Sequence, residues 1–174
     1  MALLTFLRRS FIVAMLAATS LPGLASATDQ SDICVYGGNA SGVMAAVTVA
    51  KQGCSVVIIE PSRWLGGMTG GGLSHVDWGR EKAVGGTALS ILSKNYDDAK
   101  YREVFLELVK KYRIRVIYEH RVTSVIKEGT SLRSIALDYA PPDARGCPVA
   151  KPTKPGARTI QAKVFIDCSY EGDL

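Results

Sequence analysis

The chain has 174 residues, 47% of them apolar and 21% charged, and its formal net charge is +5. This is ordinary globular composition for about one domain, which excludes disordered and collagen-like chains. The basic residues are spread along the sequence rather than clustered, so we expect no nucleic-acid partner.

The first 27 residues have the pattern of an export signal peptide. Arg8 and Arg9 precede an apolar run over 11–18, and small residues follow up to Ala27, after which we expect cleavage. The run is far shorter than the about 20 residues that span a bilayer, so we expect no stable membrane anchor. The arginine pair fits both a twin-arginine signal and a general secretion signal, and either predicts a periplasmic or secreted protein.

The next segment predicts a βαβ unit with two parallel strands. A short apolar strand over 32–36 ends at a glycine pair, a helix follows over 41–52, and a second strand over 55–59 ends at Glu60. Twelve of the 17 glycines lie between Gly37 and Gly86. This concentration predicts a surface formed by backbone atoms, and a long glycine-rich loop after Glu60.

The remaining sequence alternates helical and strand patterns. It predicts helices over 84–95 and 98–112, strands over 116–118, 121–127 and 132–139, a proline-rich surface loop over 140–155, and two further strands over 158–162 and 163–167. The two strands over 121–139 would form a hairpin or small β-meander.

The turn after the first strand occupies the position of the GxGxxG fingerprint. Gly37 would make the tight turn, and Gly42 would let the helix pack closely against the strand. Asn39 replaces the middle glycine, so we expect it either to adopt a left-handed conformation or to shift a bound phosphate slightly outward. Glu60 would accept both ribose hydroxyls of an adenosine, the alternative being an acid that faces solvent. The fold class is therefore α/β, a Rossmann-like dinucleotide-binding domain over 28–174 with a parallel sheet and a small β-meander.

The cysteines predict neither a zinc site nor any other metal site, because none of the four forms a CxxC pair. Cys34, Cys54 and Cys168 lie in or beside apolar runs, which is typical of small buried side chains, although an oxidising compartment also permits disulfides. Cys147 lies in the proline-rich loop, where we expect exposure.

Three blocks, at 36–43, 60–71 and 165–174, occur in the order and spacing of one family. They resemble the FAD-dependent oxidoreductases often labelled xanthan-lyase-like, with a glutathione-reductase-type FAD fold, and the likeness runs from Asp32 to the end except for the proline-rich loop. The resemblance implies FAD as cofactor and flavin-mediated redox of a small-molecule or carbohydrate-like substrate. An NAD-binding domain or a non-catalytic dinucleotide-binding module is the alternative.

The resemblance also implies which residues contact FAD. The pyrophosphate would lie against the first block, and Glu60 would bind the ribose beside Pro61 and Ser62. The chain after it would run along the phosphates toward the flavin, and Val122 would meet the adenine through its backbone. The full set is Gly37, Gly38, Asn39, Ala40, Ser41, Gly42, Glu60, Pro61, Ser62, Gly66, Gly67, Met68, Thr69, Val122, Cys168, Gly172 and Asp173.

His75, close to Asp77 and Trp78, is the candidate catalytic residue, because the chain there should pass close to the flavin. It would protonate a substrate or attach the flavin covalently, whereas the alternative is a loop histidine that bonds a neighbour. We expect His120 to be structural. Because flavoproteins of this type continue well beyond the third block, we interpret the chain as the amino-terminal part of a larger flavoprotein, inactive by itself.

Overall fold

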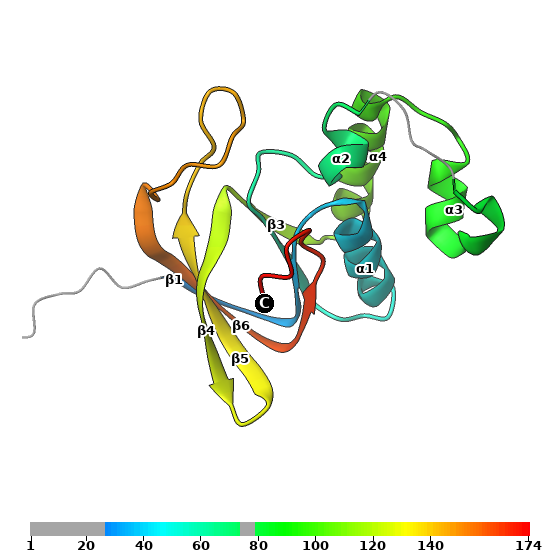
Figure 1. The fold of residues 1–174 in the computed structure, drawn as a ribbon. Helices are drawn as coiled ribbons and strands as arrows, with labels where there is room; N and C mark the ends of the chain where they lie inside the picture. The colour runs from blue at the N-terminus through cyan, green and yellow to red at the C-terminus, as the bar shows by residue number, and fades with distance from the viewer. Residues whose placement is uncertain (1–26, 74–78) are drawn as a thin grey trace, which may run out of the picture.

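The computed structural model describes residues 27–73 and 79–174, which form one mixed sheet with helices beside it (Figure 1). The strands are β1 (Ala27–Tyr36), β2 (Val56–Glu60), β3 (Arg115–Tyr118), β4 (His120–Glu128), β5 (Ser131–Tyr139) and β6 (Lys154–Asp167). The helices are α1 (Ala40–Ala50), α2 (Gly67–Gly70), α3 (Gly86–Leu92) and α4 (Asp98–Lys111), with a short 3-10 turn at Glu81–Ala83. The predicted α/β class is confirmed.

The sheet has the strand order β3-β2-β1-β6-β5-β4 and changes direction at β6. β1 pairs in parallel with β2 and β6, and β2 pairs in parallel with β3, whereas β5 runs antiparallel to both β4 and β6. The predicted βαβ unit and hairpin are therefore confirmed. The parallel registers bring the ends of four strands to one edge of the sheet, at Tyr36, Glu60, Tyr118 and Asp167. Ligands bind beyond such an edge in open α/β sheets.

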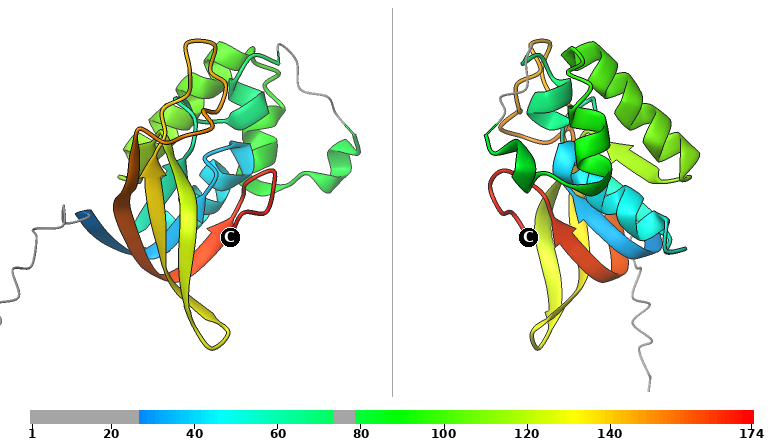
Figure 2. Two further views of the ribbon diagram at one scale, coloured as in Figure 1. Left: turned by 60° about the vertical axis from the view of Figure 1, so that its left-hand side comes forward. Right: turned by 90° about the vertical axis from the view of Figure 1, so that its right-hand side faces the viewer.

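The alternation of side chains along β1 divides the core into two layers. Ile33 and Val35 pack toward α1 and α4, whereas Cys34 and Tyr36 pack toward the side of β4 and β5. Figure 1 shows α1, α2 and α4 on one side of the parallel strands and the β4–β5 hairpin on the other, and Figure 2 shows the same layers from two more directions. Both layers bury their apolar residues completely near the sheet centre.

Helix α4 confirms the amphipathic face that the sequence predicts. Tyr101, Phe105 and Val109 are buried against the core, and the side chain of Asp97 caps the helix by accepting a hydrogen bond from the Lys100 N–H at 2.8 Å. In the glycine-rich segment, by contrast, the structure corrects the prediction of an unbroken loop, because α2 forms a single helical turn there.

Strand β6 corrects the prediction of two separate strands after the proline-rich loop. It is continuous from Lys154, because residues 154–161 pair with β5 and residues 158–167 pair with β1, so the two pairings overlap. Pro155 lies close to the start of the strand, where a missing N–H is tolerated. The proline-rich loop therefore ends earlier than predicted, at residue 153.

The side chain of Asp32 links three strands near the middle of β1. It accepts hydrogen bonds from the N–H and hydroxyl of Ser55 at 2.9 and 2.6 Å, and its other oxygen lies 2.7 Å from the Lys163 ammonium. The Lys163 bond, followed by those from Ser55, holds the pKa of Asp32 well below its usual value. A carboxylate at this position therefore joins β1 to the start of β2 and to β6.

Within the described residues, no helix has both the length and the apolar character needed to cross a membrane.

Candidate cofactor site

The turn between β1 and α1 needs glycine at two predicted positions. Gly37 has φ +92°, and an added Cβ there would lie 2.8 Å from the backbone of Cys168. At Gly42 an added Cβ would overlap the carbonyl oxygen of Gly37. The close approach that the fingerprint predicts is therefore present, and the terminal segment after β6 takes part in it.

Of the two alternatives expected for Asn39, the left-handed conformation is wrong, because its backbone is extended (φ −68°, ψ −177°); the outward shift of a bound phosphate stays a prediction. Its side chain caps α1: Oδ1 accepts hydrogen bonds from the Gly42 N–H at 3.0 Å and from the Ser41 hydroxyl at 2.7 Å. The amide nitrogen donates to the carbonyl of Cys168. Asparagine therefore serves here as a helix cap that also fixes the chain after β6.

Glu60 is buried at the end of β2, with 7% of its surface exposed. One carboxylate oxygen accepts the N–H of Gly38 at 2.6 Å and the other accepts the N–H of Ser62 at 2.7 Å. A carboxylate offers about four acceptor positions, so each oxygen retains one for a further donor. The alternative of an acid that faces solvent is wrong.

The segment around α2 is held beside the glycine turn. The Gly66 N–H donates to the carbonyl of Gly38 at 2.8 Å, and the guanidinium of Arg102 on α4 donates to the carbonyl of Gly70 at 2.9 Å. The Met68 N–H donates to the hydroxyl of Tyr170 at 3.0 Å. The three sequence blocks, far apart in the chain, therefore meet at one place.

The segment after β6 folds into a compact turn around Asp167 and Ser169. The carboxylate of Asp167 accepts the N–H groups of Ser169 and Leu174, each at 2.8 Å, and the Ser169 hydroxyl accepts those of Gly172 and Asp173 at 2.9 and 3.2 Å. Burial by itself would raise the pKa of Asp167, but hydrogen bonds from Leu174 and Ser169 lower it overall. This turn stands beside the end of β1, where the Cys168 N–H donates to the carbonyl of Tyr36 at 2.8 Å.

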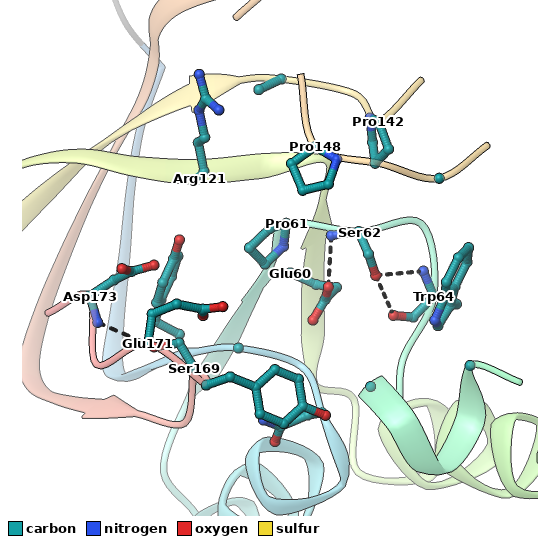
Figure 3. Close-up of a pocket in the computed structure, with 18 of the residues that line it drawn as sticks. Glu60, Pro61, Ser62, Trp64, Arg121, Pro142, Pro148, Ser169, Glu171 and Asp173 are labelled. Carbon is teal, nitrogen blue, oxygen red and sulfur yellow. Dashed lines mark hydrogen bonds between the residues drawn. The ribbon is translucent and has the colours of Figure 1, made fainter. Parts of the chain in front are cut away.

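A cavity of about 400 Å³ opens at this edge of the sheet (Figure 3). Its volume lies at the lower end of the roughly 300–1,000 Å³ typical of ligand sites, which suits one part of a dinucleotide. The predicted site residues among its lining are Gly37, Asn39, Glu60, Pro61, Ser62, Gly67, Met68 and Asp173.

The other predicted residues are not part of the lining of this cavity: Gly38, Ala40, Ser41, Gly42, Gly66, Thr69, Val122, Cys168 and Gly172. The Val122 N–H donates to the buried hydroxyl of Tyr36 at 3.3 Å, so this backbone group is already paired. Burial raises the pKa of Tyr36 to about 12, which keeps this hydroxyl protonated. Burial also raises the pKa of the Cys168 thiol.

The candidate catalytic residue His75 lies outside the described residues, as do Asp77 and Trp78. His120 is buried, its Nδ1 lies 2.6 Å from the Tyr118 carbonyl, and its ring packs against Tyr139. These contacts support the structural role predicted for His120.

The sequence did not indicate several residues that line the cavity. Tyr36, Trp64, Arg121, Tyr170 and the loop over 140–153 all contribute to its wall. Arg121 lies directly before Val122 in β4, and the prolines of the loop signalled only a stiff surface segment. The positions of Arg121 and of the loop depend on the pairing of β4, β5 and β6, which no local motif encodes.

The parallel βαβ unit, the glycine turn and the strand-end carboxylate together define a dinucleotide-binding α/β domain. A family model described as FAD dependent oxidoreductase matches residues 32–174. The chain belongs to this family of FAD-dependent oxidoreductases, and its cofactor is FAD.

Several solved structures share the fold. The chain is similar to the myxobacterial chondrochloren halogenase CndH, described as a FAD-dependent halogenase, with a TM-score of 0.55 and 14% identity over 81% of this chain and 37% of that one. It is similar to the thioredoxin reductase of T. acidophilum, with a TM-score of 0.52 and 21% identity over 79% of this chain and 34% of that one. It is also similar to a 3-ketosteroid-Δ4-(5α)-dehydrogenase from Rhodococcus jostii RHA1, with a TM-score of 0.55 and 12% identity over 86% of this chain and 47% of that one.

At these identities the structures establish the fold alone, and this chain spans about a third to a half of their length. No curated protein matches the chain significantly in sequence.

The residues around the cavity fit the adenosine end of FAD. Glu60 presents two remaining acceptor positions to the cavity, as many as the two hydroxyls of a ribose require. Proline side chains supply apolar walls, and the amino terminus of α1 lies at the same edge of the sheet, where a helix dipole favours phosphate.

Proposed function

We propose that the protein is an enzyme that uses FAD to oxidise or reduce a small-molecule substrate, with carbohydrate-like compounds among the candidates. The observation that carries the proposal is the meeting of Glu60, the Gly37–Gly42 turn and the Gly66–Gly70 segment around one cavity. FAD supplies the redox chemistry when it is bound.

The chain's own residues bind and orient the cofactor. Glu60 would hold the ribose, the α1 amino terminus would bind the pyrophosphate, and the α2 segment would run from there toward the flavin. Asn39 fixes the relative position of these parts, since its side chain bonds both α1 and the segment after β6. The protein therefore provides orientation and electrostatics.

A visible spectrum of the purified protein tests the proposal. We expect bound FAD to give a yellow protein whose absorbance bleaches when dithionite is added. A colourless protein that takes up no added FAD would contradict the proposal, and selective retention of NAD would favour the nicotinamide alternative.

We also propose that the first 27 residues direct export, leaving Thr28 as the first residue of a periplasmic or secreted protein. The support is the pattern of Arg8, Arg9 and the apolar run. Amino-terminal sequencing of exported protein that begins at Met1 would contradict cleavage. Changing Arg8 and Arg9 to lysine distinguishes the two routes, because only twin-arginine transport should stop.

The 174-residue chain alone should not turn over a substrate. The support is that the chain covers only 37% of the halogenase, 34% of the thioredoxin reductase and 47% of the ketosteroid dehydrogenase to which it is similar. Flavin-dependent turnover by the 174-residue protein would contradict this part of the proposal.

A further inference from the structure

The loop over 140–153, between β5 and β6, forms one wall of the cofactor cavity. Its contributions to the lining are Ala140, Pro142, Gly146, Pro148 and Val149. Figure 3 shows Pro142 and Pro148 on one side of the cavity, with Pro61 and Glu60 on the other. The loop therefore faces the residues that would hold the adenosine ribose.

Arg121 on β4 holds one arm of this loop. Its guanidinium donates two hydrogen bonds to loop carbonyls, to Val149 at 2.7 Å and to Ala150 at 3.2 Å. The planar fork of arginine can reach two carbonyls at once, which the ammonium group of lysine does less well. Arg121 also lines the cavity, so the same side chain joins the loop to the site.

Arg63, which follows Glu60 by three residues, holds the other arm. It donates to the carbonyl of Pro142 and pairs with the carboxylate of Glu119 at 3.1 Å, while the backbone carbonyl of Glu119 accepts the Ala140 N–H at 2.8 Å. The connection after β2 is thus tied directly to the loop.

The tip of the loop is fixed by its own hydrogen bonds. The Asp143 carboxylate accepts the N–H groups of Arg145 and Cys147, each at 2.9 Å, and the Asp143 N–H donates to the Cys147 carbonyl at 3.0 Å. The loop is therefore an ordered wall whose place depends on its two arginine anchors.

The charge around the cavity indicates which part of the cofactor the loop faces. Among the described lining residues, Glu60, Glu171 and Asp173 are acidic, whereas Arg121 is the one basic residue and its guanidinium already bonds two carbonyls. A phosphate is disfavoured beside three carboxylates, whereas an uncharged purine between proline side chains is not.

We propose that the loop over 140–153 encloses the adenine of FAD against Pro61, and that Arg121 is a positioning residue that sets affinity for the adenosine half of the cofactor. This inference rests on the proposed use of FAD. It assigns a binding function to a segment outside the family-like sequence blocks.

The test compares Arg121→Met with Arg145→Met, a control on the same loop whose side chain is exposed and outside the cavity lining. Binding of FAD, ADP and FMN is measured by calorimetry, because ADP carries the adenosine half and FMN lacks it. We expect Arg121→Met to weaken FAD and ADP by about tenfold or more and FMN by less than about twofold. Arg145→Met should leave all three unchanged.

Equal weakening of FMN and ADP, or unchanged ADP binding, would overturn the inference. The unfolding midpoint of the unliganded variant shows whether Arg121→Met folds. If it does not fold, Pro148→Asp, at an exposed residue of the cavity wall, is compared with Pro152→Asp, which lies outside the lining. Pro148→Asp should weaken ADP selectively, and ADP binding equal to that of Pro152→Asp would again overturn the inference. A wild-type protein that binds no FAD would instead refute the proposed function.

Discussion

Replacing Glu60 by glutamine tests the centre of the site while keeping the size of the side chain. Glutamine retains one acceptor oxygen, but its NH₂ group would face one of the two backbone N–H donors, from Gly38 or Ser62. A buried donor that loses its acceptor costs about 1–3 kcal/mol. We therefore expect the free energy of unfolding to fall by about that amount, even without FAD.

The loss of FAD binding energy in E60Q should be larger than the contribution of a neutral hydrogen bond. Hydrogen bonds to a charged group contribute about 1.5–3 kcal/mol, so E60Q should weaken FAD binding by about 10- to 150-fold. Alanine would be a poorer probe, because it would leave both N–H groups without their acceptor.

Fluorescence titration of FAD gives the affinity, and urea unfolding of the apoprotein gives the stability. Glu128→Gln is the matched control, because Glu128 is exposed at the β4–β5 hairpin and pairs only with Arg133 among its described ion-pair partners. FAD affinity of E60Q within about twofold of the wild type would refute the reasoning that Glu60 binds the ribose.

Three further predictions follow from packing and charge. Gly42→Ala should prevent folding or destabilise by more than about 3 kcal/mol, because its Cβ would overlap the backbone of the preceding turn, whereas Gly85→Ala has open space; equal thermal midpoints would contradict this. Iodoacetamide at pH 8 should modify exposed Cys147 first and leave Cys34 unmodified in the native state, because burial raises the pKa of Cys34 to about 12; mass spectrometry that finds both labelled equally fast would show the reverse. Asp32→Asn should lower the thermal midpoint at pH 7. The pKa of Asp32 is lower in the folded state than its unfolded value of about 3.9, so the ionised carboxylate stabilises the fold above that value, and this stabilisation is lost as the pH falls through the folded pKa. A difference between the thermal midpoints of wild type and variant that widens on acidification would contradict the prediction.

The elements with a clear local signal could be predicted from the sequence. The apolar run of β1, the helix α4 and the β4–β5 hairpin each have a periodicity of their own, and the structure has all three. α2 could not be predicted in this way, because two of its four residues are glycine, which disfavours helices. It is stabilised instead by contacts from distant parts of the chain, including the Arg102 bond to Gly70.

The same distinction applies to the site. Gly37, Gly42 and Glu60 belong to one βαβ unit, so their spacing along the chain predicts their spacing in space. Arg121 reaches the cavity only because β4 pairs with β5 and β5 with β6, and the loop over 140–153 is placed by the same pairings. Neither residue type nor spacing reveals such a register.

The pairing of β6 with β1 determines when the domain can fold. Gln30 and Gln161, which bond each other at 2.8 Å across these strands, are 131 positions apart in the sequence. During synthesis β1, β2 and β3 are complete long before β6, so one edge of β1, an inner strand of the sheet, stays unpaired until residues 158–167 have been made. Pairing over such separations also slows folding. Truncation before β6 would therefore leave two unpaired sheet edges, at β1 and β5, rather than a smaller domain.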